Sequence, residues 1–118
     1  MIKLEITDVH TVLDDQIRDL LRESVDKLER YIPKHARQSA HAQANLKQVL
    51  TQGNKKATAE IILHLPHEIL TAKESTLTMP EAIGLVENKL VTQLKKYKEK
   101  HANPKLLRRL SSRLRRQS

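Results

Sequence analysis

Residues 57–75 read ATAEIILHLPHEILTAKES, and this stretch decides the fold. Apolar side chains alternate with polar ones from Ala57 to Leu65, which is the pattern of a strand with one buried face. Pro66 ends that strand, because proline cannot donate a backbone hydrogen bond. His67-Glu68 then turn the chain into a shorter strand over residues 69–75. Strands this close in sequence usually pair with each other, so the segment is predicted to be an antiparallel hairpin.

The same alternation extends upstream of this hairpin. Residues 40–47 alternate small apolar with polar side chains and predict another strand, although alanine is a poor strand former. A turn over residues 51–55, which contains glycine and asparagine, joins that strand to the hairpin. Residues 2–7 alternate as well. The sequence therefore predicts four strands, the last three as an antiparallel meander.

Two segments have a helical period instead. From residue 13 to residue 32 apolar side chains recur every three or four positions, and Pro33 ends the run. Thr78-Met79-Pro80-Glu81 has the spacing of a capping box with proline in the first turn, and the helix that it begins is predicted to run to about His101. Asn103-Pro104 interrupts the pattern there.

The predicted fold class is therefore α+β, with the order β-α-β-β-β-α. One four-stranded sheet with two helices packed on one face buries the apolar stripes of both helices. The other face of the sheet is predicted to be wet. Its polar side chains are His41, Gln43, Asn45, Lys47, Thr58, Glu60 and His64. Residues 1–101 form this domain, and residues 102–118 form a basic C-terminal tail.

Charge is divided very unevenly along the chain, whose net charge is +8. The first 88 residues hold 11 basic and 13 acidic side chains, whereas the last 30 hold 11 basic side chains and the single acid Glu99. Such a basic segment suits a polyanion, and nucleic acid is the commonest one in a cell. Tyr31 and Tyr97 are the only aromatic residues besides histidine. The chain can hardly stack bases, so it is expected to recognise phosphates and shape.

Several other functions are excluded or disfavoured by composition. The chain has no cysteine, which rules out disulfides and cysteine-based zinc sites. His64 and His67 lack the spacing of a chelate, so no metal or other cofactor is expected. Only two glycines are present, too few for a phosphate-binding loop, and we expect no enzyme and no small-molecule substrate. No apolar run is long enough to cross a membrane, and no signal-peptide core follows Met1, so a cytoplasmic location is expected.

Three segments resemble a known family. Residues 27–32, KLERYI, resemble its basic-Leu-x-basic-Tyr-apolar segment, and residues 65–74 are similar to its Leu-Pro-Gly-Gly-x-Leu-x-Ala-x-Glu. Residues 79–83 and 89–100 resemble its Asp-Met-Tyr-Ala-Ala-Ile and Lys-Leu-x-Arg-Gln-Leu-x-Lys-x-Lys. The family is that of the ribosome hibernation-promoting factors and ribosome-associated inhibitors, and the resemblance covers about residues 1–101.

The chain departs from this pattern at five positions. Thr78 and Pro80 replace the usual aspartate and tyrosine at the helix start, and both are compatible with a helix N-terminus. His67 and Glu68 replace the two glycines of the hairpin. Thr92 stands where the family has an arginine.

The resemblance implies a fold and a function. It implies a domain like those that bind double-stranded RNA, located on the small ribosomal subunit near the decoding centre. There it would occupy the channel of mRNA and of A- and P-site tRNA and keep ribosomes inactive during starvation or stationary phase. Long members carry a further dimerisation domain, and the length of this chain resembles the short type.

Candidate RNA-binding residues come from both helices and from the tail. The end of the first helix and the segment after it supply Lys27, Arg30 and Lys34, with Arg37 beyond. The second helix supplies Lys89, Gln93, Lys95, Lys96, Lys98 and Lys100. The tail supplies arginines that include Arg108 and Arg109. Lysine is a flexible point charge and suits phosphate contacts that tolerate any sequence.

Two alternatives fit the same residues. A generic module for double-stranded RNA or DNA would have similar topology and charge. A protein-interaction domain would dock its basic tail on an acidic partner. The prediction that we carry forward is binding to the ribosomal RNA of the small subunit.

Overall fold

The sheet contains four strands in the order β1-β2-β3-β4. The structure is a computed structural model that describes residues 1–9 and 13–101 of the chain. Its elements, in chain order, are β1 (Lys3–Val9), α1 (Asp15–Glu29), α2 (Lys34–Arg37), β2 (His41–Thr51), β3 (Asn54–Leu65), β4 (Glu68–Thr76) and α3 (Met79–His101). None of the helices in this part of the chain is long and apolar enough to cross a bilayer.

The last three strands form the predicted antiparallel meander, and β1 pairs with β2 in parallel. The parallel pairing requires α1 to cross over between β1 and β2, so the sheet is mixed. The turn between β2 and β3 is tighter than the predicted five residues. Thr51 still pairs with Asn54, which leaves only Gln52 and Gly53 in the turn. Gly53 has a φ of 77°, a left-handed conformation that glycine adopts without steric cost.

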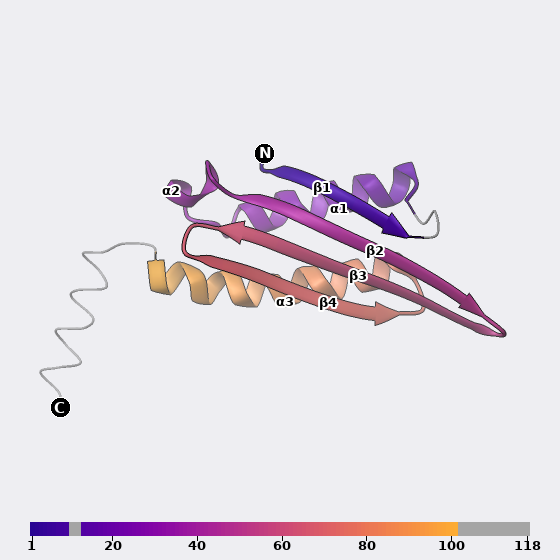
Figure 1. The fold of residues 1–118 in the computed structure, drawn as a ribbon. Helices are drawn as coiled ribbons and strands as arrows, with labels where there is room; N and C mark the ends of the chain where they lie inside the picture. Colours follow the sequence, from indigo (N-terminus) through magenta and orange to yellow (C-terminus); the bar gives the residue numbers. More distant parts are fainter. Residues whose placement is uncertain (10–12, 102–118) are drawn as a thin grey trace, which may run out of the picture.

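Helices α1 and α3 cover the same face of the sheet, as predicted (Figure 1). Their directions follow from the strand order. Strands β1, β2 and β4 all run one way, because β4 is antiparallel to β3 and β3 is antiparallel to β2. Each helix returns against the strand before it, so α1 and α3 run parallel to each other. Both helices therefore end at the same end of the molecule.

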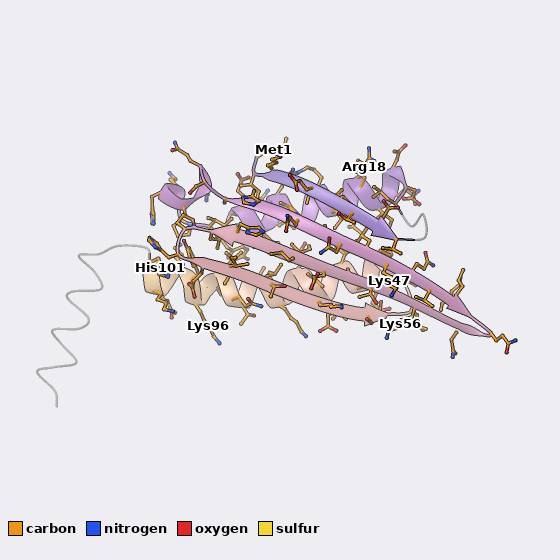
Figure 2. All side chains as sticks on the ribbon, in the orientation of Figure 1. Met1, Arg18, Lys47, Lys56, Lys96 and His101 are labelled. Atoms are coloured by element: carbon orange, nitrogen blue, oxygen red, sulfur yellow. The ribbon has the colours of Figure 1, made fainter. Side chains whose placement is uncertain are left out.

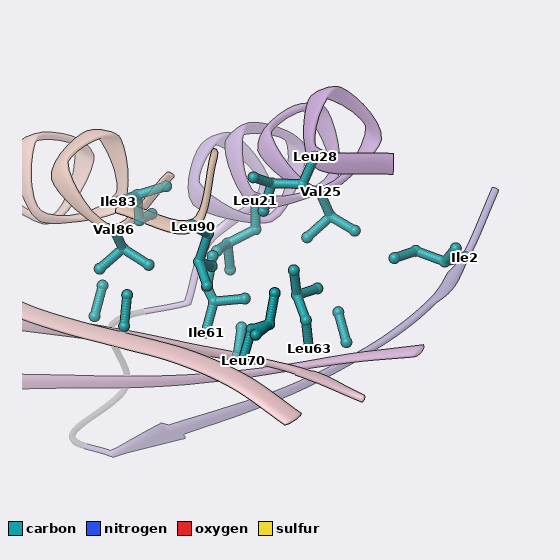
Figure 3. Close-up of a cluster of buried hydrophobic side chains, with 14 of the residues drawn as sticks. Ile2, Leu21, Val25, Leu28, Ile61, Leu63, Leu70, Ile83, Val86 and Leu90 are labelled. Atoms are coloured by element: carbon teal, nitrogen blue, oxygen red, sulfur yellow. The ribbon is translucent and has the colours of Figure 1, made fainter. Parts of the chain in front are cut away.

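A single apolar core lies between the helices and the sheet (Figure 3). Leu21, Val25 and Leu28 of α1 and Leu90 of α3 are completely buried against the sheet. Burying each such side chain contributes about 1.5–3 kcal/mol relative to leaving it exposed. The strands contribute small side chains to this core: Ala42, Ala44, Ala57 and Ala59. Alanine is a weak strand former, but its small side chain leaves room for the large side chains of the helices.

The opposite face of the sheet is accessible to solvent, as predicted. The seven polar side chains expected there are half-buried or exposed. They contact one another across strands: His41 stacks on His64 with ring centroids 4.2 Å apart, and the Asn45 amide donates to Glu60 at 2.9 Å.

Helix α1 is shorter than the predicted span of residues 13–32. It begins after Asp14, whose carboxylate accepts a hydrogen bond from the Ile17 amide at 2.8 Å. At the other end, the amides of Tyr31 and Ile32 bond carbonyls three residues back rather than four, so the chain tightens before Pro33. A short helix that the sequence did not predict, α2, then follows.

Helix α3 has the predicted extent. The Thr78 hydroxyl accepts a hydrogen bond from the Glu81 amide at 3.4 Å, and the Thr78 carbonyl accepts from Ala82 at 3.1 Å. The threonine therefore caps the helix as its spacing indicated.

Candidate nucleic-acid interface

Exposed cations gather where α1 and α3 end side by side. Their parallel directions bring two negative helix-dipole ends together, and lysines and arginines are favourable there. Figure 2 shows Lys96 and His101 at this end of α3. We name the exposed cations of this region the helix-end surface: Lys27, Arg30, Lys34, Lys95, Lys96 and Lys98.

One flank of α3 faces the outer edge of β4. The Gln93 side-chain amide donates to the Thr71 carbonyl at 2.9 Å. Lys89 forms an ion pair with Glu74, and Lys100 forms one with Glu68 at 3.5 Å. Three residues predicted to bind RNA thus contact β4 and partly cover its free edge, where unpaired strand groups would otherwise invite another chain. The glutamates of β4 also offset the charge of these two lysines.

The other flank of α3 carries lysines without such partners. Helical spacing places Lys95 and Lys98 on the side opposite Gln93, which is the side that packs toward α1. Half-buried Val91, one turn earlier on the same flank, packs against the core and supports this placement. Neither lysine forms an ion pair with the residues that the structure describes. Their charges are available to an external anion.

The first helix contributes less positive charge than expected. Lys27 pairs with Glu23 at 3.6 Å, but both side chains are more than half exposed, and such a pair is weak. Lys27 and Arg30 also border a shallow depression that is shared with acidic residues. Its lining is Asp19, Arg22, Glu23, Asp26, Lys27 and Arg30. Exposed charges of both signs therefore lie along α1, whereas the exposed Lys95, Lys96 and Lys98 lie close together near the end of α3.

Arg37 has a structural role. Its guanidinium donates to the Ile32 carbonyl at 2.9 Å and to the Arg30 carbonyl at 3.4 Å. These are carbonyls left without helical partners where α1 ends. Arg37 thereby connects α2 to α1 and positions Lys34 beside the helix-end surface.

A cluster that sequence reasoning missed holds the end of α3 in place. The buried Tyr97 hydroxyl donates to the Pro66 carbonyl at 2.8 Å. His101 contacts the Glu68 carboxylate at 3.0 Å. The sequence does not show the contact of Tyr97 with Pro66, because the two residues lie 31 positions apart. The cluster ties the last turns of α3 to the β3–β4 turn and so fixes the positions of Lys95 and Lys98.

Burial raises the pKa of the Tyr97 hydroxyl above its ordinary value of 10.0, and the negative charge of Glu68 raises it further. The hydroxyl therefore stays protonated and keeps its hydrogen bond at neutral pH. In the turn itself His67 has a φ of 73°. This left-handed conformation favours glycine, the residue that the resembled family has there.

Within residues 1–9 and 13–101 no three histidine or acidic side chains are grouped to hold a metal ion. The predicted tail residues Arg108 and Arg109 lie outside the described residues, as does the whole tail.

A sequence profile of the family described as sigma 54 modulation protein / S30EA ribosomal protein matches residues 4–102. The chain belongs to this family. The chain is 33% identical over 98 residues to a curated protein of Staphylococcus aureus (strain COL) named ribosome hibernation promotion factor. The match covers 83% of this chain and 49% of that protein. The resemblance drawn from the three motifs is thereby confirmed.

Solved structures support the S30EA fold. The N-terminal domain of Protein Y from Thermus thermophilus is 27% identical, with a TM-score of 0.63 over 82% of this chain and 99% of that one. A ribosomal subunit interface protein from Coxiella burnetii is 21% identical, with a TM-score of 0.65 over 83% of this chain and 99% of that one. The latter shows similarity of fold alone. The chain spans about half the length of the curated relative, and its assignment to the short type stays a prediction.

Proposed function

We propose that this S30EA family protein binds ribosomal RNA of the small subunit near the decoding centre. By occupying the mRNA and tRNA sites it holds ribosomes inactive in the cytoplasm during starvation or stationary phase. The mechanism is occupation of a site and requires neither catalysis nor a cofactor. The observation that carries the proposal is the helix-end surface, whose exposed cations gather where the parallel helices α1 and α3 of a ribosome-factor fold end.

The chemistry of this surface favours a folded RNA backbone as its ligand. Lysine side chains suit phosphates, and the described domain offers only one exposed aromatic ring other than histidine, that of Tyr31. The packing of α1 against α3 holds the cations at fixed spacing, so the protein is expected to select its RNA partly by shape. Residues 89, 93 and 100 support this arrangement from the β4 side and contact RNA at its margin.

Sedimentation with ribosomal subunits tests the proposal. The protein is expected to migrate with small subunits in a sucrose gradient and to inhibit translation in a purified system. Both effects should weaken steeply with added salt, because each neutralised phosphate releases counterions. The triple variant K27Q/K95Q/K98Q should lose most of both effects, whereas K3Q/K73Q, which removes two exposed lysines elsewhere, should retain them.

Plain duplex RNA is the comparison that separates the alternatives. Equal affinity for a duplex and for intact small subunits would identify a generic double-stranded RNA module instead. Protein that remains free across the gradient at low salt would contradict the proposed function altogether.

A further inference from the structure

The β2–β3 hairpin extends beyond the rest of the sheet. Strand β1 pairs with β2 only as far as Lys47, and β4 pairs with β3 only from Ala57 onward. Among the residues that the structure describes, 48–56 therefore form a two-stranded ribbon with no neighbouring strand on either side, which we name the β-arm. Figure 1 shows it projecting past the ends of β1 and β4.

The fold gains little from this projection. Within the β-arm Leu50 is 70% exposed, and the tip residues Gln52–Asn54 are exposed as well. An isolated two-stranded ribbon is marginally stable in water, since it buries little apolar surface. A shorter hairpin would complete the same core. The β-arm is thus a candidate for external contacts.

Its charge has one sign. Lys55 and Lys56 lie in the β-arm and Lys47 lies at its base, while residues 46–59 contain no acidic side chain. The nearest carboxylate on β3, Glu60, is bonded to Asn45. None of the three lysines forms an ion pair with the residues that the structure describes.

The lysines point to both faces of the ribbon. Lys56 pairs with Val49, and Lys47 lies two residues before Val49, so Lys47 and Lys56 share the open face of the sheet (Figure 2). Lys55, opposite Leu50, points to the other face. The outer edges of the ribbon also present backbone amides that no strand of the described part of the chain pairs with, and such amides bind phosphate oxygens.

A nucleic acid fits this composition better than a protein does. Protein interfaces are enriched in tyrosine, tryptophan and arginine and depleted in lysine. The β-arm contains none of the enriched residues, and Leu50 is its one exposed large apolar side chain.

The β-arm lies at the end of the molecule opposite the helix-end surface. Strand β2 runs toward the β-arm, whereas α1 and α3 run away from it. Ten residue steps along β3, from Lys55 to Leu65, span about 34 Å. The protein thus presents two separate basic surfaces joined by a rigid sheet.

We propose that the β-arm is a second RNA-binding element, which contacts the phosphate backbone of a different segment of the same folded RNA through Lys47, Lys55 and Lys56. This rests on the proposed function for the identity of the RNA. Because the two surfaces are held about 34 Å apart, engaging both raises the affinity for an RNA whose backbone passes both places.

Substitution and shortening of the β-arm test the proposal. K55Q/K56Q is expected to weaken binding to small subunits about tenfold and to lower the slope of log affinity against log salt by about 1–2, since two phosphate contacts are lost. K55R/K56R preserves the charge and should bind like the natural protein. Deletion of Val49, Leu50, Lys55 and Lys56 removes two cross-strand pairs and keeps the register and the turn, and it should match K55Q/K56Q.

The outcomes separate this proposal from the proposed function. If K55Q/K56Q and the deletion bind as the natural protein does while K27Q/K95Q/K98Q does not, the β-arm proposal is wrong and the proposed function stands. If the natural protein binds no small subunits, both are wrong. A photoreactive side chain at Gln52 should cross-link to ribosomal RNA, and cross-linking to a protein alone would overturn the RNA assignment.

Discussion

Tyr97 connects the apolar core to the candidate interface within one side chain. Its ring lies in the stripe of α3 that packs on the sheet, and it is 2% exposed. Its hydroxyl reaches the Pro66 carbonyl at the β3–β4 turn, and its ring contacts that of His101. A phenol can do both because it has an apolar body and a polar tip. Loss of the hydroxyl should therefore loosen the end of α3 without opening the core.

Tyr97→Phe is expected to lower the free energy of unfolding by about 1 kcal/mol at pH 7, because the carbonyl of half-buried Pro66 loses its hydrogen-bond donor. The pH dependence gives a second signature. The pKa of Tyr97 is raised in the folded protein, so the unfolded chain ionises first as the pH passes 10.0. The contribution of Tyr97 is complete below that pH and is lost as the pH rises toward the folded pKa.

Denaturant unfolding at pH 7 and above pH 10 measures both effects. The natural protein should lose more stability at alkaline pH than Tyr97→Phe does. Tyr31→Phe, which alters an exposed ring, serves as the matched control and should follow the natural protein. An equal alkaline loss in all three proteins would contradict this account of Tyr97.

At the scale of elements, α3 divides its lysines between two tasks. Lys89 and Lys100 pair with glutamates of β4, whereas Lys95 and Lys98 face α1 and form no ion pair within the described residues. A charge that is already compensated inside the protein contributes less to the attraction of an external phosphate. The two flanks should therefore differ in function although both carry lysines.

The variants K95Q/K98Q and K89Q/K100Q remove the same charge from the two flanks. K95Q/K98Q is expected to weaken small-subunit binding by at least fivefold more than K89Q/K100Q, with a larger drop in the salt slope. K89Q/K100Q should instead lower the melting temperature slightly, since exposed ion pairs contribute up to about 1 kcal/mol each. Equal binding losses in the two variants would show that the pairs with β4 leave Lys89 and Lys100 free to bind.

An element could be predicted from the sequence when the residues that determine it are close together in the chain. Helix α3 was predicted correctly because its stripe and its Thr78 cap lie within the helix itself. The end of α1 was not, since the tightened turn and α2 depend on Arg37 reaching back to carbonyls of the preceding segment. The parallel pairing of β1 involves strands separated by the 31 residues 10–40, which a pattern of alternation does not encode.

The candidate interface was likewise only partly predictable from the sequence. The sequence alone identified the lysines of α3 as candidate contacts. It could not assign partners, because Glu68 and Glu74 lie on a strand and reach the helix only in the folded sheet. The β-arm escaped prediction for a related reason: its length is visible only once the ends of β1 and β4 are known.

At the scale of the whole molecule, topology concentrates the charge. Because β1, β2 and β4 run in one direction, α1 and α3 end at the same end of the molecule. The negative ends of their dipoles therefore lie near the lysines at the end of α3. The β-arm occupies the other pole. Residues 1–101 hold 16 basic and 14 acidic side chains, a net charge of only +2, so the proposed binding to RNA depends on the position of the charges rather than on their total.

The basic tail, residues 102–118, adds six basic side chains and no acidic one. Its deletion should leave the domain folded, because residues 2–97 already supply an extensive apolar core within the part of the chain that the structure describes. We expect the shortened protein still to bind small subunits at low salt, with a lower affinity and a shallower salt dependence, since non-specific phosphate contacts are lost. Replacing the six basic side chains of the tail with glutamine at full length controls for the shortening itself and should behave like the deletion. If instead deletion abolished binding while K27Q/K95Q/K98Q retained it, the tail alone would carry the interaction, and the protein would be a docking domain for an acidic partner.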